Sequence, residues 1–291
     1  MFFSSWLRKP NAKPRTSRRA TSTFRPQLEF LEGRDVPSTL HVTGLGDQGP
    51  GTLRYEIALA NSGDTIVFSS TSKKGVVSVV SGTITLQSGE LVINKSLTIQ
   101  GPGWGTLTIT SPRWADSFGN GYNGSRIFEV DGAGTTVAIS GLTLTSGGGT
   151  RYGDGVSGYP NDGYGGAILN FGSLTLSNCK LGGAGGTVFG NTAQYGGAIA
   201  NFGQMTVSDC NVIENSAIAP VHSVAEGGGI YNAGTMIVSG GYVVYNSAGT
   251  GGGIYNASAA AALTVLDSIF SNHNPDNIFG PYTDGGGNTF K

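Results

Sequence analysis

The chain has 291 residues, of which 50 are glycine and only 12% are charged, and its formal net charge is −1. Glycine at this frequency would break an array of helical repeats, so the composition excludes a helical solenoid. Two cysteines are too few for a disulfide-rich scaffold, and no run of eighteen apolar residues is present that would span a membrane as a helix.

Residues 1–38 are predicted to form a basic tail without a fold of its own. The first forty positions hold eight basic and three acidic residues, a net charge of +5, whereas nine basic and fifteen acidic residues give −6 in the remainder. Basic stretches can bind nucleic acid, but this one lacks interleaved aromatic side chains or a partner fold. We therefore expect a disordered tail or a sorting segment, and no nucleic-acid partner.

The end of this tail supports sorting. Residues 24–38, Phe-Arg-Pro-Gln-Leu-Glu-Phe-Leu-Glu-Gly-Arg-Asp-Val-Pro-Ser, resemble the Leu-Glu-x-Leu-Glu-x-Arg-x-x-Pro-Ser element near the start of predicted exported proteins of planctomycete-type bacteria. The resemblance implies an extracellular or cell-surface location. An ordinary secretory signal would place an apolar run of seven or more residues after the basic positions, and this sequence has none.

A short helix is predicted over residues 52–60. Thr52 can cap its amino terminus, and Leu53, Ile57 and Ala60 fall on one face. The ends of an open parallel coil carry unpaired strand edges, and we expect this helix to cover the first of them.

The segment around this helix carries a second resemblance. Residues 51–68 are similar to the block that opens the β-helix of many bacterial surface proteins. Six β-rich runs bounded by Gly, Pro or Asn begin within it or follow it: residues 62–68, 82–86, 91–99, 105–109, 127–130 and 137–144. We expect them to belong to one elongated domain, residues 39–291.

The second half of the chain repeats the phrase Gly-Gly-(Ala/Gly)-Ile-x-Asn. The four copies are residues 165–170, 196–201, 227–232 and 251–256, so the spacing is 31, 31 and 24 residues. Variation of this size places loops between fixed strands. Each copy is followed by a run in which apolar and polar residues alternate with period two, as in a strand. A further short apolar segment comes next in each repeat, and it usually ends in Asn.

Three short strands per repeat, joined by Gly- and Asn-rich bends, predict an all-β fold, a right-handed parallel β-helix of about eight to ten turns. The repeated phrases resemble those of the polymorphic outer-membrane-protein and pectate-lyase-like superfamily over about residues 40–290. The resemblance implies the fold. Because that superfamily includes lyases, hydrolases, adhesins and coat proteins, it implies no single activity.

Two columns of polar residues are expected to stack between turns. Asn170, Asn201, Asn232 and Asn256 end the four phrases, and their amides can bond to one another and to backbone groups of the bends, so we interpret them as structural. Cys179 and Cys210 occupy one column of adjacent turns. The spacing allows a disulfide, but side chains of one column rarely point at each other, so the pattern favours buried free thiols.

Three insertions carry the candidate site residues: 111–126, 147–163 and 217–226. Aromatic side chains beside Asp and Asn are typical of carbohydrate-binding surfaces, and the candidates for glycan contact are Trp114, Tyr122, Tyr152 and Tyr159. The candidates for catalysis, if the chain is an enzyme, are Arg151, Asp154, Asp162 and Glu226. The alternative is an ordinary solvated loop with turn-forming Asp and Gly.

No compact catalytic motif is present. The three histidines, His41, His222 and His273, lack the spacing of a metal site or a triad, so no metal or cofactor is predicted from the residues. The Asn-Thr-Asp, Asp-Asp and Gly-His-Gly elements of pectin-cleaving hydrolases are also missing. Pectate lyases of this fold hold Ca²⁺ with acidic side chains and use an Arg as base, and no sequence motif excludes that arrangement.

Two functions therefore remain open. The first is a non-catalytic, exported or cell-surface structural or adhesion-type protein, which contacts polysaccharide or another cell-surface glycan through the three insertions. The second is a polysaccharide-active enzyme, a pectate-lyase-like, Ca²⁺-dependent uronate lyase. Clustered acidic and basic side chains would favour the enzyme, and an aromatic strip would favour binding.

Overall fold

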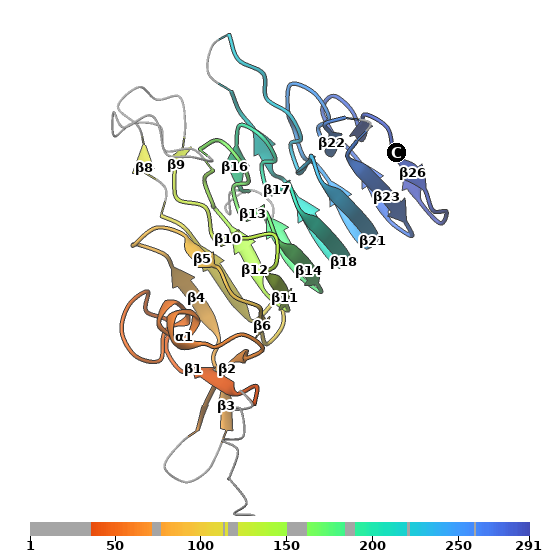
Figure 1. The fold of residues 1–291 in the computed structure, drawn as a ribbon. Helices are drawn as coiled ribbons and strands as arrows, with labels where there is room; N and C mark the ends of the chain where they lie inside the picture. Colours follow the sequence, from red (N-terminus) through yellow and green to blue (C-terminus); the bar gives the residue numbers. More distant parts are fainter. Residues whose placement is uncertain are drawn as a thin grey trace, which may run out of the picture. The chain divides into compact units, whose positions relative to one another are not determined.

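The computed structural model describes residues 36–71, 77–112, 114–115, 122–149, 162–183, 190–219, 222–258 and 260–291. All of them belong to one compact unit, Val36–Lys291. This unit is a parallel β-helix in which successive strands of each column lie side by side in chain order (Figure 1). The predicted fold class is confirmed.

The first column is a seven-stranded parallel sheet built around the repeated phrase. Its strands are β5 (Leu91–Ile93), β10 (Phe128–Val130), β13 (Ile168–Asn170), β17 (Ile199–Asn201), β20 (Ile230–Asn232), β22 (Ile254–Asn256) and β25 (Ile278–Phe279).

Two further columns share a sixteen-stranded sheet, because β18 and β21 are long enough to run through both. One column comprises β1 (Thr39–Val42), β2 (Thr65–Thr71), β6 (Leu97–Gln100), β11 (Thr136–Ser140), β14 (Ser173–Ser177), β18 (Gln204–Ile213), β21 (Thr235–Val244), β23 (Ala262–Leu266) and β26 (Thr283–Asp284). The other comprises β4 (Gly82–Thr85), β7 (Leu107–Thr110), β12 (Thr143–Thr145), β15 (Lys180–Gly182), the second halves of β18 and β21, β24 (Ile269–Ser271) and β27 (Thr289–Phe290).

Short strands complete the described structure. β16 (Thr192–Ala193) and β19 (Ser216–Ala217) form a parallel pair between turns. Two pairs are antiparallel: β3 (Val77–Val79) with β2, and β8 (Trp114–Ala115) with β9 (Tyr122–Asn123).

The register of the strands follows the alignment of the repeats. Ile168, Ile199, Ile230 and Ile254 are paired in sequence along the first column and are fully buried, as the phrase predicted. The alternating residues of the other two columns meet in the same core, including the set Leu181, Val212, Val243 and Phe270. Since a slip of one residue would turn each inner set outward, this pattern specifies the register.

The predicted capping helix is α1, Leu53–Leu59. Thr52 is its N-cap, and its hydroxyl accepts a hydrogen bond from the Tyr55 N–H over 3.4 Å. Leu53, Ile57 and Ala60 are buried in the common core, so the apolar face lies where the sequence placed it. The helix packs against β1 and β5, and thus covers the first turn.

Each glycine of the pair in the phrase is required for a different structural reason. The first glycine has a positive φ, between 61° and 70° in the four copies, and residues with a side chain rarely adopt such values. The second packs against the next turn: a Cβ added at Gly197 would lie 2.2 Å from the Gly228 carbonyl oxygen. Replacement of the second glycine would therefore push neighbouring turns apart.

The four Asn residues that end the phrases form a hydrogen-bonded ladder through the interior. The Asn170 Nδ2 donates to Asn201 Oδ1 over 2.7 Å, Asn201 donates to Asn232 over 2.8 Å, and Asn232 donates to Asn256 over 2.7 Å. Each amide also donates to a backbone carbonyl of the bend that follows it, at Gly172, Gly203, Gly234 or Ala261. The predicted stack is confirmed, and its buried amides pair with one another and with backbone carbonyls.

A second ladder lies at the end of the third column. Asn191 Nδ2 donates to Asn215 Oδ1 and Asn215 Nδ2 donates to Asn246 Oδ1, both over 3.0 Å. His273 occupies the next place: its Nδ1 accepts from the Asn246 N–H over 3.1 Å, and its Nε2 donates to the Val243 carbonyl over 2.8 Å. This pattern requires a neutral imidazole, and burial lowers the pKa of His273 accordingly.

Both cysteines are buried free thiols. They follow the bends at Asn178 and Asp209, whose φ angles are 51° and 52°. The Cys179 N–H lies 3.4 Å from the Cys210 Sγ, so the two residues stack between turns as expected.

Candidate functional site

The outer face of the seven-stranded sheet carries a row of large side chains. In each of its strands the central residue points away from the core, since successive side chains alternate between the two faces. Paired in sequence, these outward residues are Val92, Glu129, Leu169, Ala200, Tyr231, Tyr255 and Phe279. From β20 to β25 the row is therefore entirely aromatic.

Aromatic residues on either side of the phrase widen this row. Tyr164 and Tyr195 precede the glycine pairs, and Phe171 and Phe202 follow the ladder amides. We name the connected set the aromatic strip: Tyr164, Phe171, Tyr195, Phe202, Tyr231, Tyr255 and Phe279.

Ring contacts join the aromatic strip from turn to turn. Tyr164 stacks on Tyr195 with centroids 4.8 Å apart, Tyr231 stacks on Tyr255 at 5.6 Å, and Tyr255 stacks on Phe279 at 5.2 Å. Between these stacks, Tyr195 meets Tyr231 edge to face at 5.4 Å. The ring spacing thus follows the spacing of the coil, which packs the rings into a continuous surface.

The aromatic strip lies outside the core but shields part of the sheet from water. Leu169 and Ala200 are completely buried, yet neither belongs to the core cluster. Side chains on the outer face must therefore cover them. The rings themselves are only partly buried, and Phe279 is 45% exposed.

One carboxylate lies among the tyrosines. Glu226 is in register with Tyr195 of the preceding turn, and Tyr195 is in register with Tyr164. The pKa of Tyr255 is raised by burial, by the negative charge of Glu226 and by a hydrogen bond with that carboxylate. Burial, with Tyr164 and Glu226 next in effect, raises the pKa of Tyr231 to about 12. These tyrosines are thus neutral hydroxyl groups beside a charged acceptor.

A buried arginine lies at the amino-terminal side of the same face. Arg126 Nη1 is 2.6 Å from both Glu90 Oε2 and Glu129 Oε2, and Arg126 also donates to the Tyr164 carbonyl over 2.9 Å. Burial raises the pKa of Glu129 against the lowering effect of Arg126, and the charge of Glu90 raises it further. The two carboxylates therefore share one guanidinium next to the outward row.

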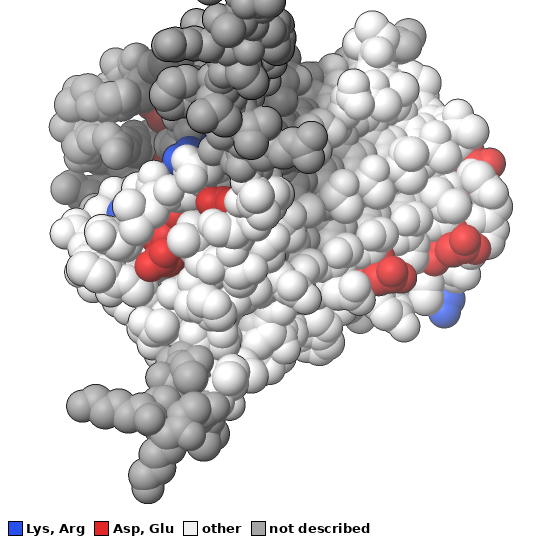
Figure 2. Space-filling view, turned by 60° about the horizontal axis from the view of Figure 1, so that its bottom comes forward, with Lys and Arg blue, Asp and Glu red and all other residues white. Residues whose placement is uncertain are grey.

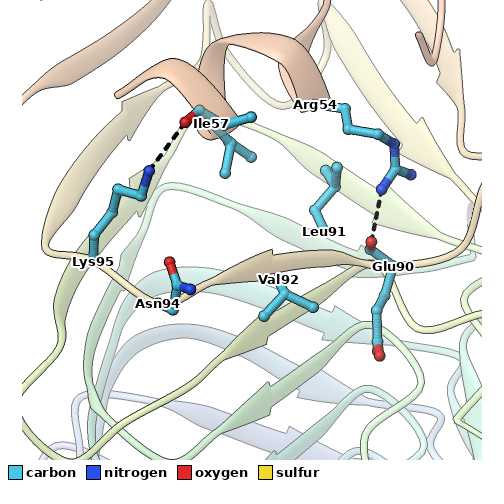
Figure 3. Close-up of a pocket in the computed structure, with 8 residues that line it drawn as sticks. Arg54, Ile57, Glu90, Leu91, Val92, Asn94 and Lys95 are labelled. Atoms are coloured by element: carbon cyan, nitrogen blue, oxygen red, sulfur yellow. Dashed lines mark hydrogen bonds between the residues drawn. The ribbon is translucent and has the colours of Figure 1, made fainter. Parts of the chain in front are cut away.

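A hollow of about 430 Å³ opens between α1 and β5 (Figure 3). Arg54 and Lys95 line it, and both charged groups form hydrogen bonds with the backbone. Arg54 Nη1 donates to the Glu90 carbonyl over 2.8 Å, and Lys95 Nζ donates to the Ala58 carbonyl over 3.2 Å. The hollow thus lies where the capping helix meets the first turns, and the hydrogen bonds of these two cations connect the two elements.

The structure describes some of the sequence-predicted site residues. Glu226 lies beside the aromatic strip, and Asp162 is exposed at the start of a described segment. Trp114 and Tyr122 lie in β8 and β9, whose backbone pairing alone is described. The remaining candidates, Arg151, Tyr152, Asp154 and Tyr159, lie outside the described residues. The proposed convergence of the four catalytic candidates stays a prediction.

Charged groups are sparse on the described surface. Figure 2 shows a face that is mostly neither acidic nor basic, with acidic side chains in a few small groups. Among the described residues, no three His, Cys, Asp or Glu side chains are close enough to hold a metal ion.

Sequence analysis missed the aromatic strip, although the signal was present. The repeats were aligned by their buried positions. The fifth position of the phrase varies, and its pattern is visible only when the residues of successive turns are compared. Comparison of that position across repeats gives Leu169, Ala200, Tyr231 and Tyr255, and the position before the phrase gives Tyr164, Tyr195, Glu226 and Thr250. Both sets are outward and adjacent in the coil.

Comparison of the chain with protein-family models, with curated proteins and with solved structures finds no significant match. Within the described ranges, no helix has the length and apolar character needed to cross a bilayer.

Proposed function

We propose that this chain is a non-catalytic, exported or cell-surface β-helical protein that binds polysaccharide through the aromatic strip. The observation that carries the proposal is the connected set of seven partly buried aromatic side chains on and beside the outer face of the seven-stranded sheet. The insertions 111–126, 147–163 and 217–226 are further contact regions in this proposal.

The position of the aromatic strip argues for a ligand. Outward residues of a parallel coil face water, and contiguous apolar patches there are uncommon unless they contact something. Aromatic side chains with hydroxyl groups suit sugars, because their carbon atoms give apolar contact to a pyranose while polar groups bond to its hydroxyls. Glu226 and Gln194 supply such polar groups at the strip, and Gln194 Nε2 donates to the Tyr195 hydroxyl over 3.0 Å.

The repeat of the coil also matches an extended ligand. A row of rings spaced 4.8–5.6 Å apart presents equivalent contacts along one direction. A polymer of identical units can use several of these contacts at once, which raises its affinity without any single strong site. A small monosaccharide would use one or two rings and bind weakly.

Export is proposed from the amino-terminal segment. Its similarity to the start of exported planctomycete-type proteins, and the similarity of residues 51–68 to the opening of bacterial surface β-helices, support an extracellular or cell-surface location. The β-helix superfamily with pectate-lyase-like or polymorphic outer-membrane-protein repeats is the family we propose on the same grounds.

Binding is tested with the full chain on a panel of insoluble neutral, amino and acidic polysaccharides. We expect Tyr255→Ala to weaken binding by about three- to tenfold, the contribution of one aromatic contact. Tyr242→Ala is the matched control, because Tyr242 is 49% exposed in β21 and lies outside the aromatic strip. Equal retention of both variants, with circular dichroism unchanged, would contradict the proposal.

A polysaccharide-active enzyme is the second candidate, favoured by the carboxylates that flank Arg126. A carboxyl with a raised pKa beside an ionised one is an arrangement that can serve acid–base chemistry. Release of reducing ends or unsaturated products, with and without Ca²⁺, tests it. Loss of activity in Glu129→Gln would assign these carboxylates, and loss in Arg151→Ala or Asp154→Ala would assign the insertion 147–163.

A further inference from the structure

We infer that Glu226 and the tyrosines around it bind an ammonium group, and that the polysaccharide bound by the aromatic strip contains amino sugars. The inference deepens the proposed function and rests on it, since it names the class of sugar. It is argued from the position of one carboxylate among four tyrosine rings.

Tyrosines of the same and the neighbouring turns surround the position of Glu226 in the coil. Tyr195 is its register partner on the preceding turn, and Tyr164 stacks on Tyr195 at 4.8 Å. Tyr231 meets Tyr195 edge to face at 5.4 Å, and Tyr255 stacks on Tyr231 at 5.6 Å. The charge of Glu226 acts on Tyr164, Tyr231 and Tyr255 alike.

No cation of the described residues balances Glu226. The ion pairs among those residues join Arg54 to Asp47 and Arg126 to Glu90 and Glu129, and Glu226 takes part in none of them. An ionised carboxylate can accept about four hydrogen bonds. The partly buried carboxylate thus has acceptor capacity and negative charge to offer a ligand.

The chemistry of this cluster selects a cation. The carboxylate attracts a cation, and the neutral tyrosine hydroxyls near it can accept hydrogen bonds from an ammonium group. A uronate carboxylate would meet like charge at the same place and be repelled. An amino sugar combines the required ammonium with pyranose faces that the other rings can contact.

The test compares oligomers of glucosamine, N-acetylglucosamine and galacturonic acid by titration calorimetry with the full chain. We expect the glucosamine oligomer to bind at least tenfold more tightly than the other two, with an affinity that falls as salt is raised. Glu226→Gln should remove this preference and leave binding of the N-acetylated oligomer unchanged. Asp276→Asn, a change at an exposed acidic residue, is the control and should alter nothing.

The outcomes separate the two proposals. Binding of the N-acetylated oligomer that is lost in Tyr255→Ala supports the aromatic strip, whatever Glu226 does. Equal binding of charged and uncharged oligomers would overturn the ammonium inference alone. Failure of every oligomer to bind would overturn both. Binding of a lysine-rich peptide in preference to glucosamine would assign the ammonium to a protein ligand and overturn the amino-sugar assignment.

A ligand-free measurement checks the charge argument. If a basic side chain of the chain itself balanced Glu226, then Glu226→Gln would leave that cation unpaired and lower the melting temperature. We expect the melting temperature to stay the same or rise, because a partly buried carboxylate without a cation partner costs stability. A clear decrease would overturn the inference.

Discussion

At the scale of single residues, one amide supports three neighbours in each turn. The Asn201 side chain, which is fully buried, accepts from Asn170 and donates to Asn232, and it also donates to the Thr235 carbonyl over 3.1 Å. A shorter side chain cannot reach these groups. The ladder therefore explains why Asn recurs where the bend conformation alone would accept other residues.

We predict that Asn201→Ala lowers the free energy of unfolding by about 2–4 kcal/mol, because it leaves buried polar groups unpaired on two turns. Gln204→Ala is the matched control, since the Gln204 side chain is exposed, and it should change stability by less than about 0.5 kcal/mol. Urea unfolding followed by circular dichroism measures both. Equal values would show that the ladder contributes little.

At the scale of elements, the short helix α1 is explained by the edge that it covers. Seven residues are too few for a helix that is stable by itself, so packing against β1 and β5 must supply the stability. Its apolar positions were readable from the sequence, because helical spacing puts Leu53 and Ile57 on one face. The hollow beside it and the hydrogen bonds of Arg54 were not readable, because those contacts join residues 35 or more positions apart.

Two leucines of this helix provide a direct test. Leu53 is completely buried, whereas Leu59 is 54% exposed. We predict that Leu53→Ala costs about 2–5 kcal/mol of stability and that Leu59→Ala costs less than about 0.5 kcal/mol. Thermal unfolding of the two variants distinguishes them, and a similar cost for both would mean that α1 does not cap the core.

At the scale of the whole described unit, each turn contacts only its neighbours. Stability is then close to a sum of turn and interface contributions, so a local change opens the coil locally. Protonation of His273 is one such local change. His273 ends the second ladder, and it must be neutral to accept a hydrogen bond from the Asn246 N–H. Protonation would remove that acceptor from the last turns.

The effect of pH has a definite sign. The folded pKa of His273 is lowered by burial from its ordinary value of 6.5, so the unfolded chain binds the proton more readily. The stability contributed by neutral His273 is fully present above pH 6.5 and is lost as the pH falls from that value towards the lower folded pKa.

We predict that acidification from neutral pH lowers the hydrogen-exchange protection of residues 262–291 before that of residues 36–71. His273→Asn should abolish this early opening, because an Asn continues the ladder without titrating. Hydrogen exchange followed by mass spectrometry measures the order. Uniform loss of protection along the coil, or an unchanged response in the variant, would contradict the prediction.

The sequence by itself determined the coil, its register and its first ladder, because a repeat imposes the same local geometry on every turn. Ile168 and Ile199 can be paired from the repeat alone, since two aligned phrases must stack. Only the tertiary structure decided what the outer face carries. Tyr195 and Glu226 share one outward column on successive turns, Tyr231 stands in another column, and stacking of the turns brings Tyr195 beside both. The same stacking put His273, which no Asn pattern predicted, at the end of the second ladder.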